Sequence, residues 1–161
     1  TTLFRSDLVI AAPDMGGAKR SNVYAKFLKT PLVFTHKSRE ENHKIGEMTV
    51  VGNVKNKNVI IIDDMIDTAS TVCKASEIMT KKGAKSVRVI ASHAVLSGNA
   101  YENINNSSLT EVIVTDSIKL KKQSSKIKII SIANIFASVI NNVIDHKSIS
   151  NIFIASENNQ D

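Results

Sequence analysis

Residues 58–75, N-V-I-I-I-D-D-M-I-D-T-A-S-T-V-C-K-A, decide the fold of this chain. The run at residues 59–62 is apolar and β-branched throughout, which is typical of a strand buried on both faces of a sheet. It stops at Asp63 and Asp64, and helical spacing of apolar residues begins at Val72, so the segment predicts a strand, a polar loop and a helix start. Backbone N–H groups at a helix start suit an anion, and the neighbouring carboxylates accept hydrogen bonds from hydroxyl groups. A sugar phosphate carries both kinds of group, and we expect such a ligand here.

Two other interpretations of this loop are open. Asp and Thr at a junction between a strand and a helix are ordinary N-caps. An acidic pair at the end of a strand also holds Mg²⁺ in receiver and hydrolase domains that handle phosphate. Capping does not require Asp63 and Asp64 as well, which favours a ligand over a purely structural role.

The rest of the chain repeats this alternation of short apolar strands and helices. The alternation predicts an α/β fold, a three-layer parallel sheet with helices on both faces and ligand loops at the carboxyl ends of the strands. Residues 48–54 and 58–62 flank K-N-K-N, which predicts a hairpin leading into the central strand. The expected strands are residues 8–12, 32–35, 48–54, 58–62, 86–92, 111–115 and 126–130, and helices are expected around 23–28, up to 82, over 101–106 and over 132–144.

A second unit of strand, loop and helix contains P-D-M-G-G-A-K-R at residues 13–20. The glycine pair, Gly16 and Gly17, lets a ligand approach the backbone closely, and the exposed N–H groups suit phosphate oxygens. Asp14 beside the pair is a candidate ligand for a Mg²⁺ ion that bridges phosphates. Glycine pairs also simply make turns, and the presence of two such units in one chain is what favours phosphate binding.

Residues 36–47, H-K-S-R-E-E-N-H-K-I-G-E, are charged and have no apolar period. Such a segment is typical of an exposed lid or simply of a solvated loop. In extended backbone Lys37 and Arg39 point to one side, where two cations are suited to stabilise charge on a transferring phosphoryl group.

Composition limits the other classes of function. The 161 residues fit one domain, expected over residues 1–156 with a disordered tail at 157–161. The net charge of +6 suits polyphosphate substrates as well as nucleic acid, but the lysine-rich run at 119–128 lacks the aromatic residues of single-strand binders, so we expect no nucleic-acid partner. No membrane-length apolar run or signal-peptide pattern is present, and Cys73 is the only cysteine. We therefore expect a cytoplasmic protein with no membrane association.

Five motifs occur in this chain in one order, within residues 7–153. They are P-D-M-G-G-A-K-R (13–20), H-K-S-R (36–39), D-D-M-I-D-T-A-S-T (63–71), S-H-A-V-L-S-G-N-A (92–100) and S-I-S-N-I-F (148–153). The third resembles the ribose-phosphate loop of type I phosphoribosyltransferase folds, in which an apolar strand precedes two acidic residues, two mostly apolar residues and D-[ST]-x-x-T. Together the five resemble the C-terminal half of the ribose-phosphate diphosphokinases.

The resemblance implies diphosphoryl transfer, in which the anomeric hydroxyl of ribose 5-phosphate attacks the β-phosphorus of ATP and AMP leaves. It implies that Lys37 and Arg39 contact the transferring group and that Mg²⁺ is the cofactor. The implied residues are Asp63, Asp64, Asp67, Thr68, Ala69, Ser70 and Thr71 for ribose 5-phosphate, Asp14, Gly16 and Gly17 for the diphosphate with Asp14 at the metal, and Ser148, Ser150 and Phe153 for a phosphate and ADP regulatory site between subunits.

This chain departs from the family pattern in two respects. Ser70 stands where many members have glycine. The family's enzymes also carry a related N-terminal half that supplies much of the ATP site and of the contacts in a homo-oligomer, a hexamer of full-length subunits. That half has no counterpart here, and residues 1–5 do not resemble a natural beginning, so we expect a fragment or a truncated product. We expect such a chain to keep ribose-phosphate binding and to lose turnover.

Two alternative functions share parts of this pattern. A nucleobase phosphoribosyltransferase uses the same loop at residues 63–71, but no segment here provides a hood for a base. A non-catalytic, synthetase-associated regulatory module keeps the fold and assembles with active subunits, but it has no need of Lys37 and Arg39.

Overall fold

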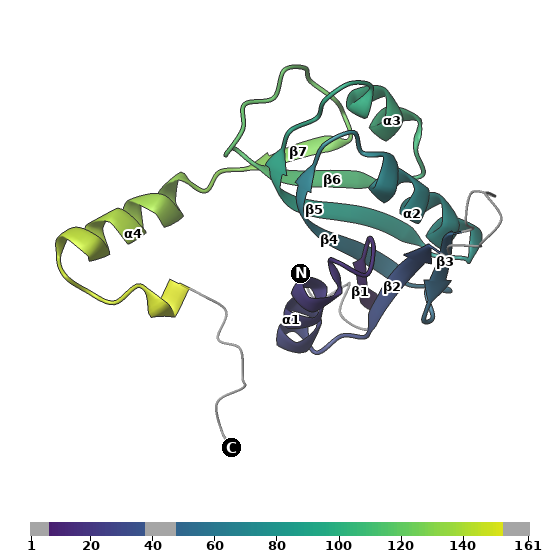
Figure 1. The fold of residues 1–161 in the computed structure, drawn as a ribbon, viewed down its shortest axis with the longest axis horizontal. Helices are drawn as coiled ribbons and strands as arrows, with labels where there is room; N and C mark the ends of the chain where they lie inside the picture. Colours follow the sequence, from purple (N-terminus) through teal and green to yellow (C-terminus); the bar gives the residue numbers. More distant parts are fainter. Residues whose placement is uncertain (1–6, 38–47, 153–161) are drawn as a thin grey trace.

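A computed structural model describes residues 7–37 and 48–152 of the chain. Within them, a sheet of seven strands has the order β3-β2-β1-β4-β5-β6-β7 (Figure 1). The pairings are parallel except that of β2 with β3, which is antiparallel. The strands are β1 (Leu8–Ala12), β2 (Leu32–Lys37), β3 (Met48–Val51), β4 (Asn58–Ile66), β5 (Ser86–Ala94), β6 (Glu111–Thr115) and β7 (Ile127–Ile130). The helices are α1 (Ala18–Leu28), α2 (Ser70–Lys81), α3 (Ala100–Asn106) and α4 (Ala133–Ile144), followed by the short 3₁₀ helix η2 (Ser150–Ile152).

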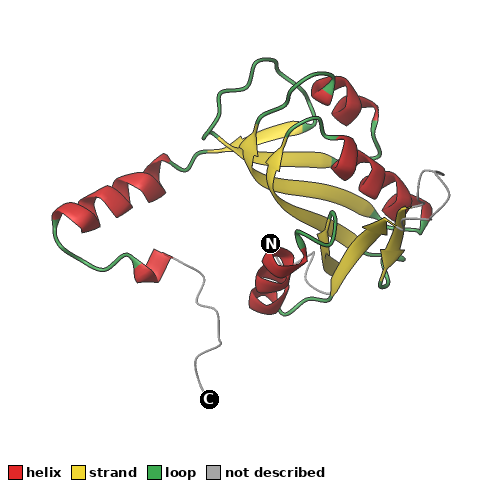
Figure 2. Ribbon diagram, in the orientation of Figure 1, coloured by secondary structure: helices red, strands yellow, loops and turns green. Residues whose placement is uncertain are grey.

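Helices lie on both faces of the sheet, as the α/β pattern predicts (Figure 2). The main core lies between the sheet and the helices α2 and α3 on one of its faces. It includes Val59, Ile61 and Met79, all fully buried. A smaller core on the other face joins Ile10 and Ile62 to Ala25 of α1. On that second face α1 packs against β1, β2 and β4, so α1 covers only one half of this face of the sheet.

The predicted hairpin between residues 48–54 and 58–62 is wrong. β3 pairs with β2, whereas β4 lies between β1 and β5 in the centre of the sheet. The reason is the apolar character of β4 on both faces, which places it where both faces are buried. β3 alternates in exposure, and only Val50 of its four residues is buried, as suits a strand at the sheet edge.

The predicted helix over residues 132–144 is confirmed as α4, but its environment differs from that of the other helices. None of its residues is buried. In Figures 1 and 2 it projects from the end of β7 and does not cover either face of the sheet. Among the described residues, no helix has both the length and the apolar character required to cross a membrane.

Candidate functional site

The loop between β4 and α2 forms a hollow of about 170 Å³ at the carboxyl end of the sheet. The backbone of Ala69 takes the left-handed conformation (φ 61°) just before α2 begins at Ser70, and no side chain caps the helix. The first N–H groups of a helix have no partners within it, so this turn offers donors to a ligand. The interpretation of Asp67 and Thr68 as caps is therefore not supported. The residues lining the hollow are Asp63, Met65, Ile66, Asp67, Thr68, Ala69, Ser70, Thr71 and Val72.

Two residues outside the predicted site hold this loop in place. Ser97 donates a hydrogen bond through its hydroxyl to Asp67 Oδ1 and another through its backbone N–H, 3.1 Å from Asp67 O. Asn103 Nδ2 of α3 donates to Thr68 O at 2.9 Å. Ser97 belongs to the S-H-A-V-L-S-G-N-A motif. It lies 30 residues after Asp67 in the sequence, so the sequence did not predict that the two residues are in contact. Within the loop, the hydroxyls of Thr68 and Ser70 lie 3.1 Å apart.

Asp63 of the acidic pair lines the hollow, and both carboxylates of the pair contact Arg20 of α1. Arg20 Nη1 is 3.3 Å from Asp63 Oδ1, and Arg20 Nη2 is 2.9 Å from Asp64 Oδ2. Asp63 lines the hollow and Asp64 does not, so the two carboxylates predicted for one ligand occupy different positions. Sequence reasoning did not assign Arg20 a role. Because β1 pairs with β4 in the sheet, the helix that follows β1, α1, lies near the end of β4 and brings Arg20 to the acidic pair.

The two carboxyl groups differ in pKa. Burial raises the pKa of Asp63 to about 6, and the hydrogen bond and charge of the neighbouring Asp64 add to the effect, partly offset by the Asp64 N–H that donates to Asp63 Oδ1 at 2.9 Å. Burial also acts against ionised Asp64, but the hydrogen bond from Asp63, the Met65 N–H and the charge of Arg20 outweigh it and lower the pKa of Asp64. One carboxylate of the pair therefore stays charged to lower pH than the other.

The loop between β1 and α1 lies beside the first loop, because Ala11 of β1 is paired with Ile61 of β4. The Gly17 N–H donates to Asp14 Oδ1 at 2.9 Å, which closes the turn. A Cβ at Gly16 would lie 3.2 Å from that same carboxylate oxygen. The compactness of the turn thus explains why residue 16 is a glycine. The side chain of Asp14 is exposed and lies at the same edge of the sheet as Asp63 and Asp64.

The remaining predicted residues lie elsewhere or outside the description. Lys37 is the last residue of β2, where it pairs with Met48, and Arg39 and Phe153 lie outside the described residues. Ser148 and Ser150, whose hydroxyl oxygens are 2.7 Å apart, follow α4, and Figure 1 shows the segment after α4 well apart from the loop between β4 and α2.

Asp14 is suited to a metal ion only together with a substrate. Among the described residues, no three His, Cys, Asp or Glu side chains gather as a metal site. Mg²⁺ commonly keeps several waters and binds through one or two carboxylates plus substrate phosphates. One exposed carboxylate therefore fits an ion shared with a diphosphate and does not fit a metal held by the protein alone.

Comparison with known proteins places this geometry in a family. A family model described as the phosphoribosyl synthetase-associated domain matches residues 41–154. The ribose-phosphate pyrophosphokinase of Porphyromonas gingivalis is 46% identical over 147 residues, covering 91% of this chain and 47% of that protein. Its namesake from Wolinella succinogenes is 44% identical over 146 residues, with the same two coverages. The chain thus spans about half the length of the curated relatives it matches.

Solved structures agree with this result. The phosphoribosylpyrophosphate synthetase of Mycobacterium smegmatis superimposes with a TM-score of 0.78 at 36% identity, over 87% of this chain and 46% of that one. The APRTase of Giardia lamblia shares the fold alone, with a TM-score of 0.55 at 15% identity over 70% of this chain and 69% of that one.

The fold of the chain is the type I phosphoribosyltransferase fold. Among proteins of this fold, the chain belongs to the phosphoribosyl synthetase-associated domain family.

Proposed function

We propose that this chain is the ribose-phosphate-binding half of a ribose-phosphate diphosphokinase. In the reaction, the anomeric oxygen of ribose 5-phosphate forms a bond to the β-phosphorus of ATP, the bond from that phosphorus to the bridging oxygen of the α-phosphate breaks, and AMP leaves. The observation that carries the proposal is the single hollow in which Asp63 and the uncapped start of α2 lie together. The identity of 46% to a ribose-phosphate pyrophosphokinase supports it.

The two ends of the hollow suit the two ends of a pentose phosphate. At the helix start, N–H groups of the turn ending at Thr71 donate to phosphate oxygens, and the helix dipole favours the anion. At the other end, Asp63 accepts hydrogen bonds from ribose hydroxyls, and its pKa of about 6 leaves it largely ionised at pH 7. Arg20 holds Asp64 beside it and lowers the repulsion between two adjacent carboxylates.

The diphosphate end of the reaction falls on the neighbouring loop. We assign Asp14, Gly16 and Gly17 to the diphosphate, since their loop leaves β1 at the same edge of the sheet as Asp63. Asp14 would hold a Mg²⁺ ion shared with the substrate, which supplies charge neutralisation between phosphate oxygens. Lys37 and Arg39 remain the candidates for the cations on the transferring group.

Calorimetric titration of the chain with ribose 5-phosphate tests the binding step. We expect binding of ribose 5-phosphate and much weaker binding of ribose or inorganic phosphate alone, because each of these fills only one end of the hollow. Thr71→Val removes an exposed hydroxyl from the lining and should weaken binding about tenfold to 100-fold, the value of one hydrogen bond to a charged group.

Thr80→Val makes the same change at an exposed position near the other end of α2 and serves as the control. Absence of binding to the unmodified chain, or equal losses in the two variants, would contradict the proposal. An assay of AMP release against consumption of a nucleobase then separates diphosphoryl transfer from nucleobase phosphoribosyl transfer.

A further inference from the structure

The turn at the start of α2 depends on a backbone conformation that alanine rarely adopts. Ala69 has φ 61°, in the left-handed region, where the Cβ of a residue other than glycine lies too close to the following carbonyl oxygen. Ala69 is also only 5% exposed and belongs to the main core. A change of Ala69 to a more common conformation would redirect the neighbouring N–H groups, on which anion binding at the helix start depends.

The two residues before Ala69 are held by the segment that joins β5 to α3 and by α3 itself. Ser97 donates through its hydroxyl to Asp67 Oδ1 and through its backbone N–H to Asp67 O at 3.1 Å. Asn103 Nδ2 donates to Thr68 O at 2.9 Å. Bonds to both residues oppose rotation of the peptide that precedes Ala69. The hydroxyl of Ser97 also occupies one carboxylate oxygen of Asp67, which lines the hollow, and leaves the second oxygen available to a ligand.

Ser97 is itself fixed by neighbours in the core. Leu96, the residue before it, is 3% exposed, and its N–H donates to Ile66 O of β4 at 3.0 Å. Ala100, at the start of α3, is fully buried, and its N–H donates to Ser97 O at 3.1 Å. The backbone on both sides of Ser97 is therefore anchored in the core, and the packing of the domain determines where its hydroxyl lies.

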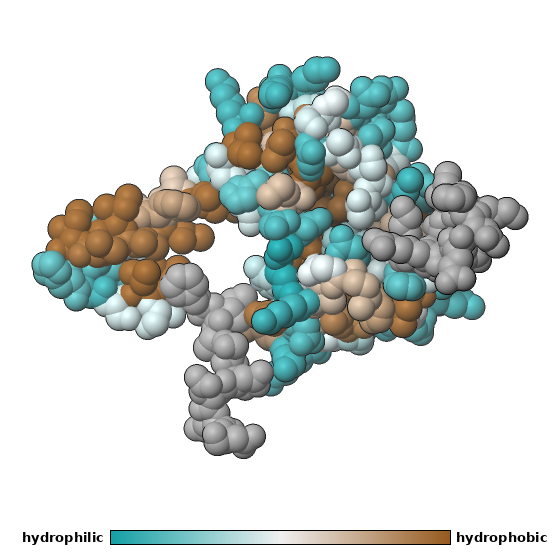
Figure 3. Space-filling model, in the orientation of Figure 1, coloured by the Kyte–Doolittle hydropathy of each residue, from teal (hydrophilic) through white to brown (hydrophobic). Residues whose placement is uncertain are grey.

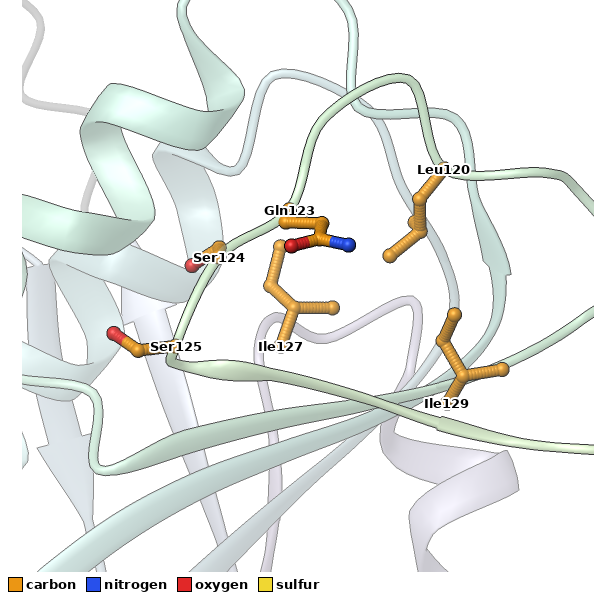
Figure 4. A pocket seen from close by; sticks show the side chains of 6 residues that line it. All are labelled: Leu120, Gln123, Ser124, Ser125, Ile127 and Ile129. Carbon is orange, nitrogen blue, oxygen red and sulfur yellow. The ribbon is translucent and has the colours of Figure 1, made fainter.

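Asn103 is fixed through polar contacts at the other end of α3. Figure 3 shows mostly hydrophilic residues in the region of this helix. From the loop before β7, Lys126 Nζ donates to Ile104 O at 3.2 Å, and Ser124 Oγ donates to Asn105 Oδ1 at 2.8 Å. Figure 4 shows Ser124 on this loop, beside a hollow of about 520 Å³ that has no charged residue in its lining. That hollow is thus no match for a phosphate, and the loop serves to support α3.

We infer that Ser97 and Asn103 are positioning residues for the phosphate end of the proposed site, because they hold residues 67–71 in the conformation that leaves N–H groups free for an anion. This inference rests on the proposed function. Neither side chain lines the smaller hollow, so each acts through the loop and not through contact with the ligand. Loss of either side chain should lower the fraction of molecules with a binding-competent loop, and the apparent affinity falls in proportion to that fraction.

Two measurements on single variants of the chain test this role. In the chain without ligand, the backbone chemical shifts of Ala69 and the coupling between its amide proton and Hα report the left-handed conformation by NMR. Calorimetry gives the affinity for ribose 5-phosphate. In Ser97→Ala we expect the Ala69 signals to move toward those of an ordinary loop residue and the affinity to fall at least about tenfold, because a bond to a charged group is lost. Asn103→Ala loses a bond to a neutral carbonyl, so the same signals should move and the affinity should fall about fivefold.

Three variants serve as controls. Ser97→Thr keeps the donating hydroxyl, so it should retain the Ala69 signals and most of the affinity that Ser97→Ala loses. Asn106→Ala and Ser108→Ala repeat the two test substitutions at exposed positions at the end of α3 and just after it. Both should leave the Ala69 signals and the affinity unchanged.

Unchanged Ala69 signals in Ser97→Ala or in Asn103→Ala would overturn the role of that residue. Unchanged affinity for ribose 5-phosphate in a variant whose Ala69 signals have moved would overturn the link between loop conformation and binding. Asn103→Ala, at the polar surface, provides the measurement if Ser97→Ala does not fold. Absence of binding to the unmodified chain would contradict the proposed function, whereas the Ala69 signals would still decide whether Ser97 and Asn103 hold the loop.

Discussion

Asp63 combines a partly buried carboxyl group with a position at the mouth of the ligand hollow. Its side chain is 20% exposed, and burial raises its pKa from 3.8 to about 6. Between these two values the folded chain holds a proton that the unfolded chain has lost, so stability falls as pH rises from about 4 to about 6. At 1.36 kcal/mol per pKa unit, the loss is at most about 3 kcal/mol. Asp64, whose pKa is lowered, has the opposite effect and acts below this window.

Urea unfolding at pH 4, 5, 6 and 7 measures this contribution. Asp63→Asn keeps an oxygen to accept the hydrogen bond from the Asp64 N–H but cannot titrate, so its stability should fall less over this range. Asp145→Asn replaces an exposed carboxylate after α4 and should behave as the unmodified chain does. The same pH dependence in both variants would show that Asp63 is not the titrating group.

Among the elements, local spacing in the sequence specified their type but not which of them are neighbours. The apolar run at residues 59–62 and the helical spacing after Thr71 give β4 and α2 directly. The partner of β3 depends on the chain between Val51 and Asn58. This segment contains a turn in which the Lys57 N–H donates to Val54 O at 3.0 Å, but it leads β4 into the centre of the sheet and does not pair it with β3. The sequence gave Arg20 no role for a similar reason, because Arg20 and Asp63, which are in contact, are 43 positions apart in the sequence.

The position of β3 predicts a large effect of one glycine substitution. Gly52 follows β3 with φ +109°, and an added Cβ would lie 2.5 Å from Val33 Cγ1 of β2. Gly52→Ala should therefore destabilise the chain by more than about 2 kcal/mol, since strain and overlap add.

Gly98→Ala is the matched control for this substitution. Gly98 also has a positive φ of +54°, but its added Cβ would have no atom within 4 Å, so a loss of about 1 kcal/mol is expected. Denaturant unfolding compares the two variants. Equal losses would indicate that β3 does not pack beside β2 as described.

On the scale of the whole molecule, the sequence predicted an apolar side for residues 132–144 but gave no sign that the described part of the chain leaves this side uncovered. Periodicity reports which side of a helix is apolar, whereas the covering element is a property of the complete polypeptide. The same limit applies to the candidate site. Asp14, Asp63 and the start of α2 lie at one edge of the sheet, and the chain spans about half the length of the relatives it matches.

Binding and turnover should consequently separate. We expect the chain alone to bind ribose 5-phosphate without releasing AMP from ATP, and the chain joined to the unmatched half of the Porphyromonas gingivalis relative, placed upstream of it, to do both. In the joined protein, Lys37→Ala should lower kcat at least about 100-fold while changing the affinity for ribose 5-phosphate less than about threefold, because a cation on the transferring group acts mainly in the transition state. Steady-state kinetics and calorimetry on the same samples measure both quantities. Equal losses in kcat and in affinity would instead assign Lys37 to ground-state binding of the sugar phosphate.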